Sequence, residues 1–188
     1  AIREAARIGG AGELRLRRSA WRDAPPPIRR RALARLMQAL SGDAHAPRHA
    51  ALASLDIALA DAAPMPARSL AGVLASSESA DGDVILHREP AAAPPPTRGL
   101  WDRRWRLGDA GEIGALGEDG LAELRALDLP SPVAWAAAPR AARVVAPGLR
   151  CAGRLVAAPL AGLGPPAEDR LAQALDLAPA PSGHAPSR

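Results

Sequence analysis

A run of arginines in the segment PIRRRALARLMQALS is the feature of this chain whose residue types and spacing most directly suggest chemistry. Arg30, Arg31 and Arg35 lie between the apolar positions of the segment, so on a helix they would point away from the side that packs. A guanidinium is permanently charged and presents several N–H donors in a plane, a geometry suited to phosphate and carboxylate groups. We take these three arginines as candidate ligands of a polyanion.

The distribution of charge along the chain supports the same interpretation. The first fifty residues contain eleven arginines and four acidic residues, the next fifty contain three arginines and six acidic residues, and the remainder is balanced. The chain has no lysine, and codon usage in a GC-rich genome would by itself enrich arginine. Codon usage does not explain why arginine is concentrated at one end. A local excess of positive charge is typical of surfaces that bind polyanions, nucleic acids above all.

A second basic cluster lies in LWDRRWRLG, residues 100–108, where two of the four tryptophans are found. Alternation predicts a strand with Trp101 and Trp105 on one face and Arg104 and Arg106 on the other. Because the chain has no Phe or Tyr, we expect the tryptophans to anchor a small core, with base stacking as the alternative. Arg104 and Arg106 are further candidates for contact with RNA phosphate, although a solvated face explains them equally well.

Other residues that could do chemistry lack the partners that chemistry requires. His45 and His49 have helical spacing, but Pro47 separates them and no third ligand is near, so we expect surface histidines and no metal site. Cys151 lies among small apolar residues and is expected to be a buried structural thiol. The glycines of GDAGEIGALG do not form a dinucleotide-binding motif. The residues therefore predict no catalytic group and no cofactor in this chain.

The elements that must position the arginines can be read from the apolar pattern. A helix is predicted over 27–41, begun by prolines and ended by Gly42 in a left-handed conformation, with an apolar face of Leu33, Leu36, Met37 and Leu40. A second helix is predicted from Pro47 to about Asp61, closed by Pro64. Residues 13–21 suggest a short strand or an irregular entry. Residues 1–64 are thus expected to form a mainly helical, basic unit.

The pattern changes after residue 64, and residues 65–177 predict a small β-rich mixed domain with short helices. Arg88 and Glu89 are expected to pair at the exit of its first hairpin. The elements expected are strands at 68–77 and 83–89 joined by an Asp81-Gly82 turn, a strand at 100–108, helices at 117–127 and from 131, a strand at 154–159 and a short helix within 165–177. The proline-rich residues 178–188 are expected to be disordered. The fold class is α+β, with a helical pair first.

The order of these motifs resembles the portion of tRNA(Ile)-lysidine synthase that follows its ATP-binding domain. In that family a helix like IRRRALARLMQALSG precedes a Pro-Arg-led helix like PRHAALASLDIALADA. A hairpin follows, with segments similar to SLAGVL and HREP, then a proline-rich spacer and a strand similar to LWDRRWRLG. The ending VVAPGLRCAGRLVAAPLAGLG is also similar to the family's closing segment. The resemblance covers roughly residues 10–165.

The resemblance implies a role in tRNA modification. The family uses ATP to ligate lysine to the wobble cytidine of an isoleucine tRNA, and its Ser-Gly-Gly-x-Asp-Ser motif holds the pyrophosphate of ATP. That motif is absent here, because Ser41-Gly42 and Ser182-Gly183 continue differently. The resemblance therefore implies a non-catalytic C-terminal part that docks tRNA, with the N-terminal ATP-binding domain as its other partner and ATP bound in that domain.

Two other classes of function are alternatives to tRNA binding. A stand-alone interaction domain could use the basic helix to bind an acidic protein. A small hydrolase using Cys151 or a serine has no supporting arrangement of residues. No run approaches the roughly 18 apolar residues of a membrane span, and a single cysteine suits a reducing compartment, so we expect a cytoplasmic protein without a membrane partner. The start at Ala1 without methionine suggests a piece of a longer chain.

Overall fold

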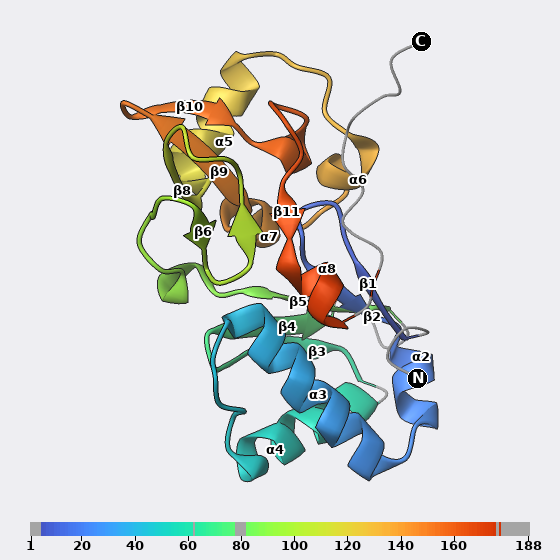
Figure 1. Ribbon diagram of the computed structural model, residues 1–188. Helices are drawn as coiled ribbons and strands as arrows, with labels where there is room; N and C mark the ends of the chain where they lie inside the picture. Colours follow the sequence, from blue (N-terminus) through green and yellow to red (C-terminus); the bar gives the residue numbers. More distant parts are fainter. Residues whose placement is uncertain (1–4, 62, 78–81, 176, 178–188) are drawn as a thin grey trace.

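A five-stranded antiparallel sheet is the centre of an α+β fold (Figure 1). The computed structural model describes residues 5–61, 63–77, 82–175 and 177. The strands run in the order β1-β2-β5-β4-β3, and their bounds are β1 (Ala6–Ile8), β2 (Leu14–Leu16), β3 (Met65–Leu70), β4 (Val73–Ser77) and β5 (Val84–Arg88). The α+β class expected from the sequence is confirmed.

The central sheet spans the boundary that the sequence predicts at residue 64. Strand β2 lies directly beside β5, with Leu14 opposite Leu86 and Leu16 opposite Val84. Residues from before and after the boundary therefore share backbone hydrogen bonds in one sheet. The N-terminal residues do not form a helical unit separate from the later strands, because β2 pairs on one side with β1 and on the other with β5.

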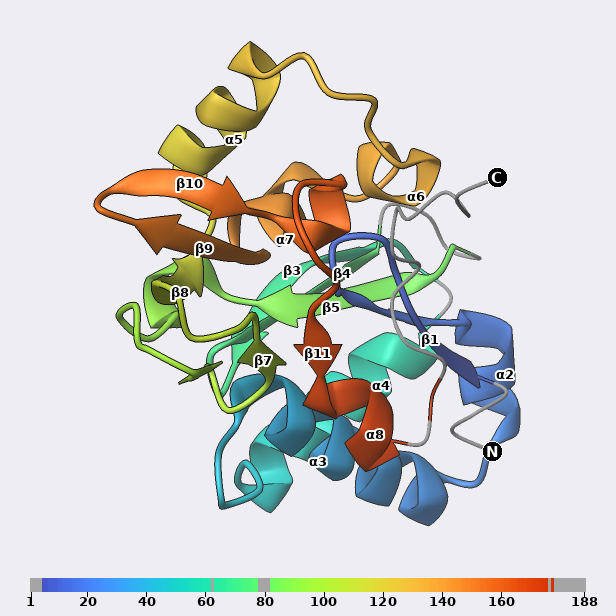
Figure 2. The same ribbon diagram turned by 45° about the horizontal axis from the view of Figure 1, so that its top comes forward.

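Three helices cover one face of the sheet (Figure 2), namely α2 (Arg18–Asp23), α3 (Pro26–Ser41) and α4 (His49–Ala60). Helix α3 follows the prediction closely: prolines occupy its first turn, and Gly42 ends it with a φ of 68°. Its apolar residues Leu33, Leu36 and Met37 are fully buried. The predicted strand near residue 14 is present as β2, whereas α2 directly after it was not predicted.

The segment 68–77 forms two strands rather than the single strand predicted. The chain reverses at Ala71 and Gly72, whose φ angles are 51° and 69°. Two successive residues with positive φ make the tight turn that matches the twist of a hairpin. The result is the hairpin β3–β4, followed by β5 as predicted. The Asp81-Gly82 turn expected before β5 falls largely outside the described residues.

A second group of strands and helices, within residues 112–161, packs on the other face of the sheet, whereas α8 (Arg170–Leu175) lies beside α3 (Figure 2). A three-stranded sheet in the order β10-β9-β8 is formed by β8 (Glu112–Ala115), β9 (Pro147–Cys151) and β10 (Arg154–Ala157), and the helices near it are α5 (Gly117–Ala126), α6 (Val133–Ala136) and α7 (Arg140–Val144). Short 3-10 turns follow β5 and β10 at η1 (Pro90–Ala92) and η2 (Pro159–Ala161). Pro139 separates α6 from α7, so the helical start predicted at 131–145 becomes two short helices.

The tryptophan segment forms a tight hairpin instead of the predicted single strand. Strand β6 (Leu100–Trp101) turns back as β7 (Trp105–Arg106), so that Trp101 lies opposite Trp105. Asp102 and Arg103 take left-handed φ angles of 52° and 53° at the turn. Strand β7 also pairs with β11 (Glu168–Asp169), which leads directly into α8 (Arg170–Leu175).

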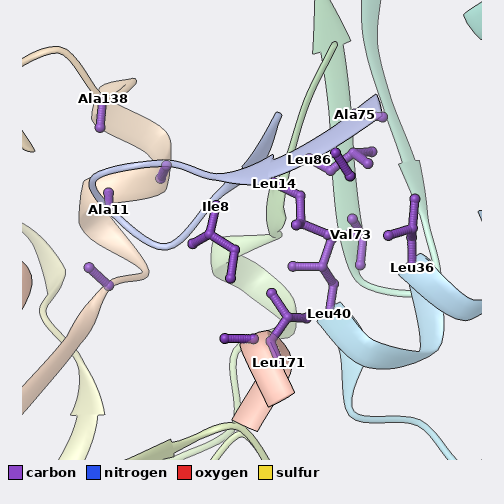
Figure 3. Close-up of a cluster of buried hydrophobic side chains, with 14 of the residues drawn as sticks. Ile8, Ala11, Leu14, Leu36, Leu40, Val73, Ala75, Leu86, Ala138 and Leu171 are labelled. Atoms are coloured by element: carbon purple, nitrogen blue, oxygen red, sulfur yellow. The ribbon is translucent and has the colours of Figure 1, made fainter. Parts of the chain in front are cut away.

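One continuous hydrophobic core joins these layers. Figure 3 shows Leu171 of α8 beside Leu40 of α3, and Leu36 of α3, Leu14 of β2 and Leu86 of β5 belong to the same cluster. Trp101 and Trp105 belong to the same cluster, with exposed fractions of 0% and 3%, so the prediction that they anchor the core is confirmed. In the part of the chain that the structure describes, no helix combines the length and the apolar composition needed to cross a membrane.

Candidate nucleic-acid interface

Helix α3 presents Arg31, Arg35 and Gln38 along one outward face. Their spacing of four and three residues places them in line, about 10 Å from first to last at 1.5 Å per residue. Arg31 and Arg35 are exposed. Within the described residues, neither guanidinium forms an ion pair or hydrogen bond, so both keep their donors for an external partner.

Arg30 is held differently from its neighbours on α3. Its Nε lies 3.5 Å from Oδ2 of Asp56 on α4, and Asp56 is completely buried. The same carboxylate accepts hydrogen bonds from Arg29 Nε at 2.7 Å and from Trp21 Nε1 at 3.2 Å. Arg30 therefore belongs to a polar cluster that joins α2, α3 and α4. Of the three arginines predicted on this helix, only Arg31 and Arg35 are free to face a partner.

Arg104 is built into the core. Its side chain donates two hydrogen bonds of 2.8 Å to the carboxylate of Asp169, and its guanidinium lies 4.1 Å from the ring centroid of Trp105. The sequence prediction placed Arg104 on the strand face opposite the tryptophans. Because the chain turns immediately before it, the arginine instead stacks on Trp105 and is buried. As a result, Arg104 fastens β7 to the start of α8 and does not offer an RNA contact.

Arg106 remains at the surface. Its Nε is 3.8 Å from Oε2 of Glu168 across the β7–β11 pair, and the two side chains are 54% and 45% exposed. Ion pairs this open contribute little to stability, because water and salt screen them. Arg106 can therefore exchange Glu168 for a phosphate at small cost.

A hollow of about 530 Å³ lies at the C-terminal end of α3, between the β6–β7 turn and α8. Gln38, Arg103, Arg170 and Gln173 contribute polar side chains to its lining, and Asp43 is its one acidic lining residue. Arg103 donates a hydrogen bond to the carbonyl of Gly42, which holds the turn against the end of α3. Arg170 is exposed, and no described residue pairs with its side chain.

The hollow continues the line of arginines on α3, since Gln38 belongs to both. We call Arg31, Arg35, Gln38, Arg103 and Arg170 together the basic strip. Sequence reasoning missed Arg103, which it assigned to the tryptophan face of a strand, and Arg170, which lies far along the chain. No local signal could have found Arg170, because the Arg104–Asp169 pair brings it to α3.

The β6–β7 turn also contains a carboxyl with a shifted pKa. Burial raises the pKa of Asp102 to about 6, although Arg88 and Arg104 act in the opposite direction. Arg88 Nη2 lies 3.3 Å from Asp102 Oδ1. The predicted pairing of Arg88 with Glu89 is therefore wrong: Arg88 pairs with Asp102, and Glu89 accepts a hydrogen bond from Ser69.

The other residues considered for chemistry lie apart from the basic strip. His45 and His49 are exposed, and no group of three or more potential metal ligands comes together among the described residues. Cys151 is exposed rather than buried, which corrects the prediction. It is the last residue of β9 and lies opposite Arg154 of β10, next to the tight turn at Ala152 and Gly153.

Comparison with known proteins found no matching family model, no matching curated protein and no matching solved structure.

Proposed function

We propose that this chain binds tRNA, as the non-catalytic C-terminal part of a tRNA(Ile)-lysidine synthase. The observation that carries the proposal is the basic strip, a row of exposed guanidiniums and an amide that runs along α3 into the hollow beside α8. The order of the sequence motifs resembles that of the family and supports this choice of family. The basic strip supports the RNA partner, because an RNA backbone can lie along it.

The strip suits a nucleic acid better than an acidic protein for a geometric reason. Its charges follow one line, as phosphates follow a backbone. Gln38 donates its Nε2 to the carbonyl of Ala44, which leaves its amide oxygen to accept a hydrogen bond from a sugar or base edge beside the arginines. Arg31, Arg35 and Arg170 are not neutralised by acidic neighbours among the described residues. Each phosphate contact releases condensed counterions, so binding through the strip should be strongly salt-dependent.

In this proposal the chain orients tRNA for chemistry that occurs elsewhere. ATP and lysine would be bound by the N-terminal domain of the parent enzyme, and the setting would be the cytoplasm. The purified chain is therefore expected to release no pyrophosphate from ATP in the presence of lysine and tRNA. Lysine-dependent pyrophosphate release by this chain alone would contradict the assignment.

The direct test replaces Arg31, Arg35 and Arg170 together by Gln and titrates labelled tRNA at several salt concentrations. Arg30 is left intact because it pairs with Asp56. We expect weaker binding, and a log–log salt slope flattened by about 0.7–0.9 for each phosphate that an arginine no longer neutralises. The matched control replaces Arg68, Arg98 and Arg154 by Gln. These three arginines are also exposed, and the control changes the net charge by the same amount as the strip variant.

Two outcomes would count against tRNA binding. If the control variant weakens binding as much as the strip variant, the attraction depends on net charge alone and the strip is not the interface. If the wild-type chain binds tRNA and heparin equally weakly but binds a glutamate-rich peptide tightly, the interaction-domain alternative is favoured.

A further inference from the structure

A second cavity, of about 350 Å³, lies on the other side of the central sheet from the basic strip, against α5, α6 and α7. Its volume is in the range of sites that hold small ligands. Leu121 and Leu124 of α5, Leu129 and Trp135 give it apolar walls. The segment between α5 and α6 contributes Ser131 to the lining. Most of the rest of the lining is polar, so these side chains can contact one part of a ligand while polar groups contact another.

Three arginines from two helices also line this cavity: Arg125 in the last turn of α5, and Arg140 and Arg143 on α7. Arg140 is already occupied, because both of its terminal nitrogens donate to Glu118. Arg125 uses only its Nε, in a 3.3 Å hydrogen bond to the carbonyl of Leu121 on its own helix. The outer nitrogens of Arg125 therefore remain available to a ligand.

Arg143 is the least satisfied of the three. Its Nε is buried, and it has no hydrogen-bond partner among the described residues. Its terminal nitrogens also form no hydrogen bond or ion pair with a described residue, so they remain available to a ligand. Asp128 also lines the cavity, but Arg125 and Arg143 together carry two positive charges against its one negative charge, so the net charge of these three groups stays positive.

We infer that this cavity binds a phosphate monoester attached to an apolar or aromatic body, as in a nucleoside monophosphate or the phosphorylated end of a nucleic acid. A phosphate monoester carries nearly two negative charges and three acceptor oxygens. Arg143 and Arg125 supply planar donors for these oxygens, and the leucines and Trp135 receive the remainder of the ligand. The inference is independent of the basic strip, which lies on the opposite side of the sheet.

The experiment is isothermal titration calorimetry of the whole chain with adenosine 5′-monophosphate, adenosine and inorganic phosphate. We expect the monophosphate to bind at least tenfold more tightly than either of the others, because only it uses both the arginines and the apolar walls. Arg143→Gln and Arg125→Gln should each weaken its binding at least tenfold. Arg98→Gln, at an exposed site elsewhere, should leave it unchanged.

A second pair of titrations distinguishes the two sources of the phosphate, using trinucleotides with a 5′-phosphate and with a 5′-hydroxyl. Tighter binding of the phosphorylated trinucleotide than of the monophosphate assigns the site to a nucleic-acid end, and the reverse assigns it to a free nucleotide. Arg125 is on the surface of α5, so its variant keeps the test valid even if Arg143→Gln does not fold. Equal binding of monophosphate and adenosine, no binding of any phosphate probe, or no effect of Arg125→Gln in a folded chain overturns the inference. Tight binding of a glutamate-rich peptide in place of the phosphates would also overturn it.

Discussion

Arg104 and Asp169, 65 residues apart in the sequence, meet inside the core through two hydrogen bonds of 2.8 Å. The same carboxylate accepts a hydrogen bond from the backbone N–H of Leu171 at 2.9 Å and so also holds the first turn of α8. Because Arg170 lies between these two residues, this buried pair determines where an arginine of the basic strip stands. The candidate RNA surface thus depends on an ion pair that lies beneath it in the core.

Removing the charge of Asp169 should be costly. Asp169→Asn keeps an acceptor for Leu171 but leaves the guanidinium of Arg104 buried without a counter-charge, so we expect a loss of about 3–5 kcal/mol in the free energy of unfolding. Urea denaturation of the variant and the wild type measures this loss in the free energy of unfolding. The double variant Arg104→Met with Asp169→Leu should recover most of the loss, because neither charge remains. A single variant that unfolds at the wild-type urea concentration would show that the pair is not closed in solution.

Trp105→Ala should lower the free energy of unfolding by about 3–5 kcal/mol, the usual cost of deleting a large buried aromatic side chain. The ring is 3% exposed and lies beneath Arg104, so its loss also removes a wall from the buried ion pair. Trp105→Phe keeps an aromatic ring in place and should cost clearly less. A thermal melting curve of the alanine variant that matches the wild type would mean that the ring is exposed, which would favour base stacking instead.

The contacts around Asp56 predict that Asp56→Ala lowers the free energy of unfolding much more than Arg30→Gln does. Asp56→Ala leaves Arg29 and the indole N–H of Trp21 without their acceptor, and we expect a loss of about 3 kcal/mol or more. Arg30→Gln removes only the partly exposed, 3.5 Å partner, and should cost less than about 1 kcal/mol. Chemical denaturation of the two variants compares them. Equal losses would show that Arg30 is as essential to the cluster as Arg29.

Asp102 should make stability depend on pH in a defined direction. Its pKa is about 6 in the folded chain and 3.8 as an unperturbed group, so the folded chain binds more protons between these values. The contribution of Asp102 to stability is therefore present at low pH and is lost as pH rises from about 4 to 6. The full shift corresponds to about 3 kcal/mol, which solvent screening at this partly open turn reduces to about 1–2 kcal/mol.

Asp102→Asn tests this, because asparagine resembles the protonated acid and readily takes the positive φ of the turn. Urea midpoints measured from pH 4 to 8 should show the variant more stable than the wild type by about 1–2 kcal/mol at pH 8, with the difference vanishing near pH 4. A difference that stays constant across this range would rule out titration of Asp102 as its cause.

What could be predicted from the sequence was what local patterns determine. Helix α3, its buried face and its end at Gly42 follow from periodicity and from one residue with a left-handed preference. The exposure of Arg31 and Arg35 follows from the same periodicity. The reversal at Ala71 was missed because alanine seldom takes a positive φ, and an apolar run such as SLAGVL favours one continuous strand.

The roles of Arg30 and Arg104 could not be predicted, because their partners come from other elements. Nothing near Arg104 in the sequence signals Asp169, and nothing near Arg30 signals Asp56. An arginine beside a tryptophan has the same appearance in the sequence whether it faces solvent or closes a buried pair. Likewise, the cavity lined by Arg125 and Arg143 exists only once α5 and α7 have packed together.

The position of β2 in the central sheet has a consequence for synthesis of the chain on the ribosome. On the side away from β1, β2 pairs with β5, and Leu14 lies opposite Leu86. The free backbone groups on that edge of β2 therefore have no strand to pair with until β5 has emerged from the ribosome. During that interval, which lasts several seconds at elongation rates of roughly 5–20 residues per second, β2 has an open strand edge, and the apolar faces of α3 and α4 have no complete sheet to cover them. Translation that stops before β5 would leave a product prone to aggregation, and a chaperone would find its binding surface there.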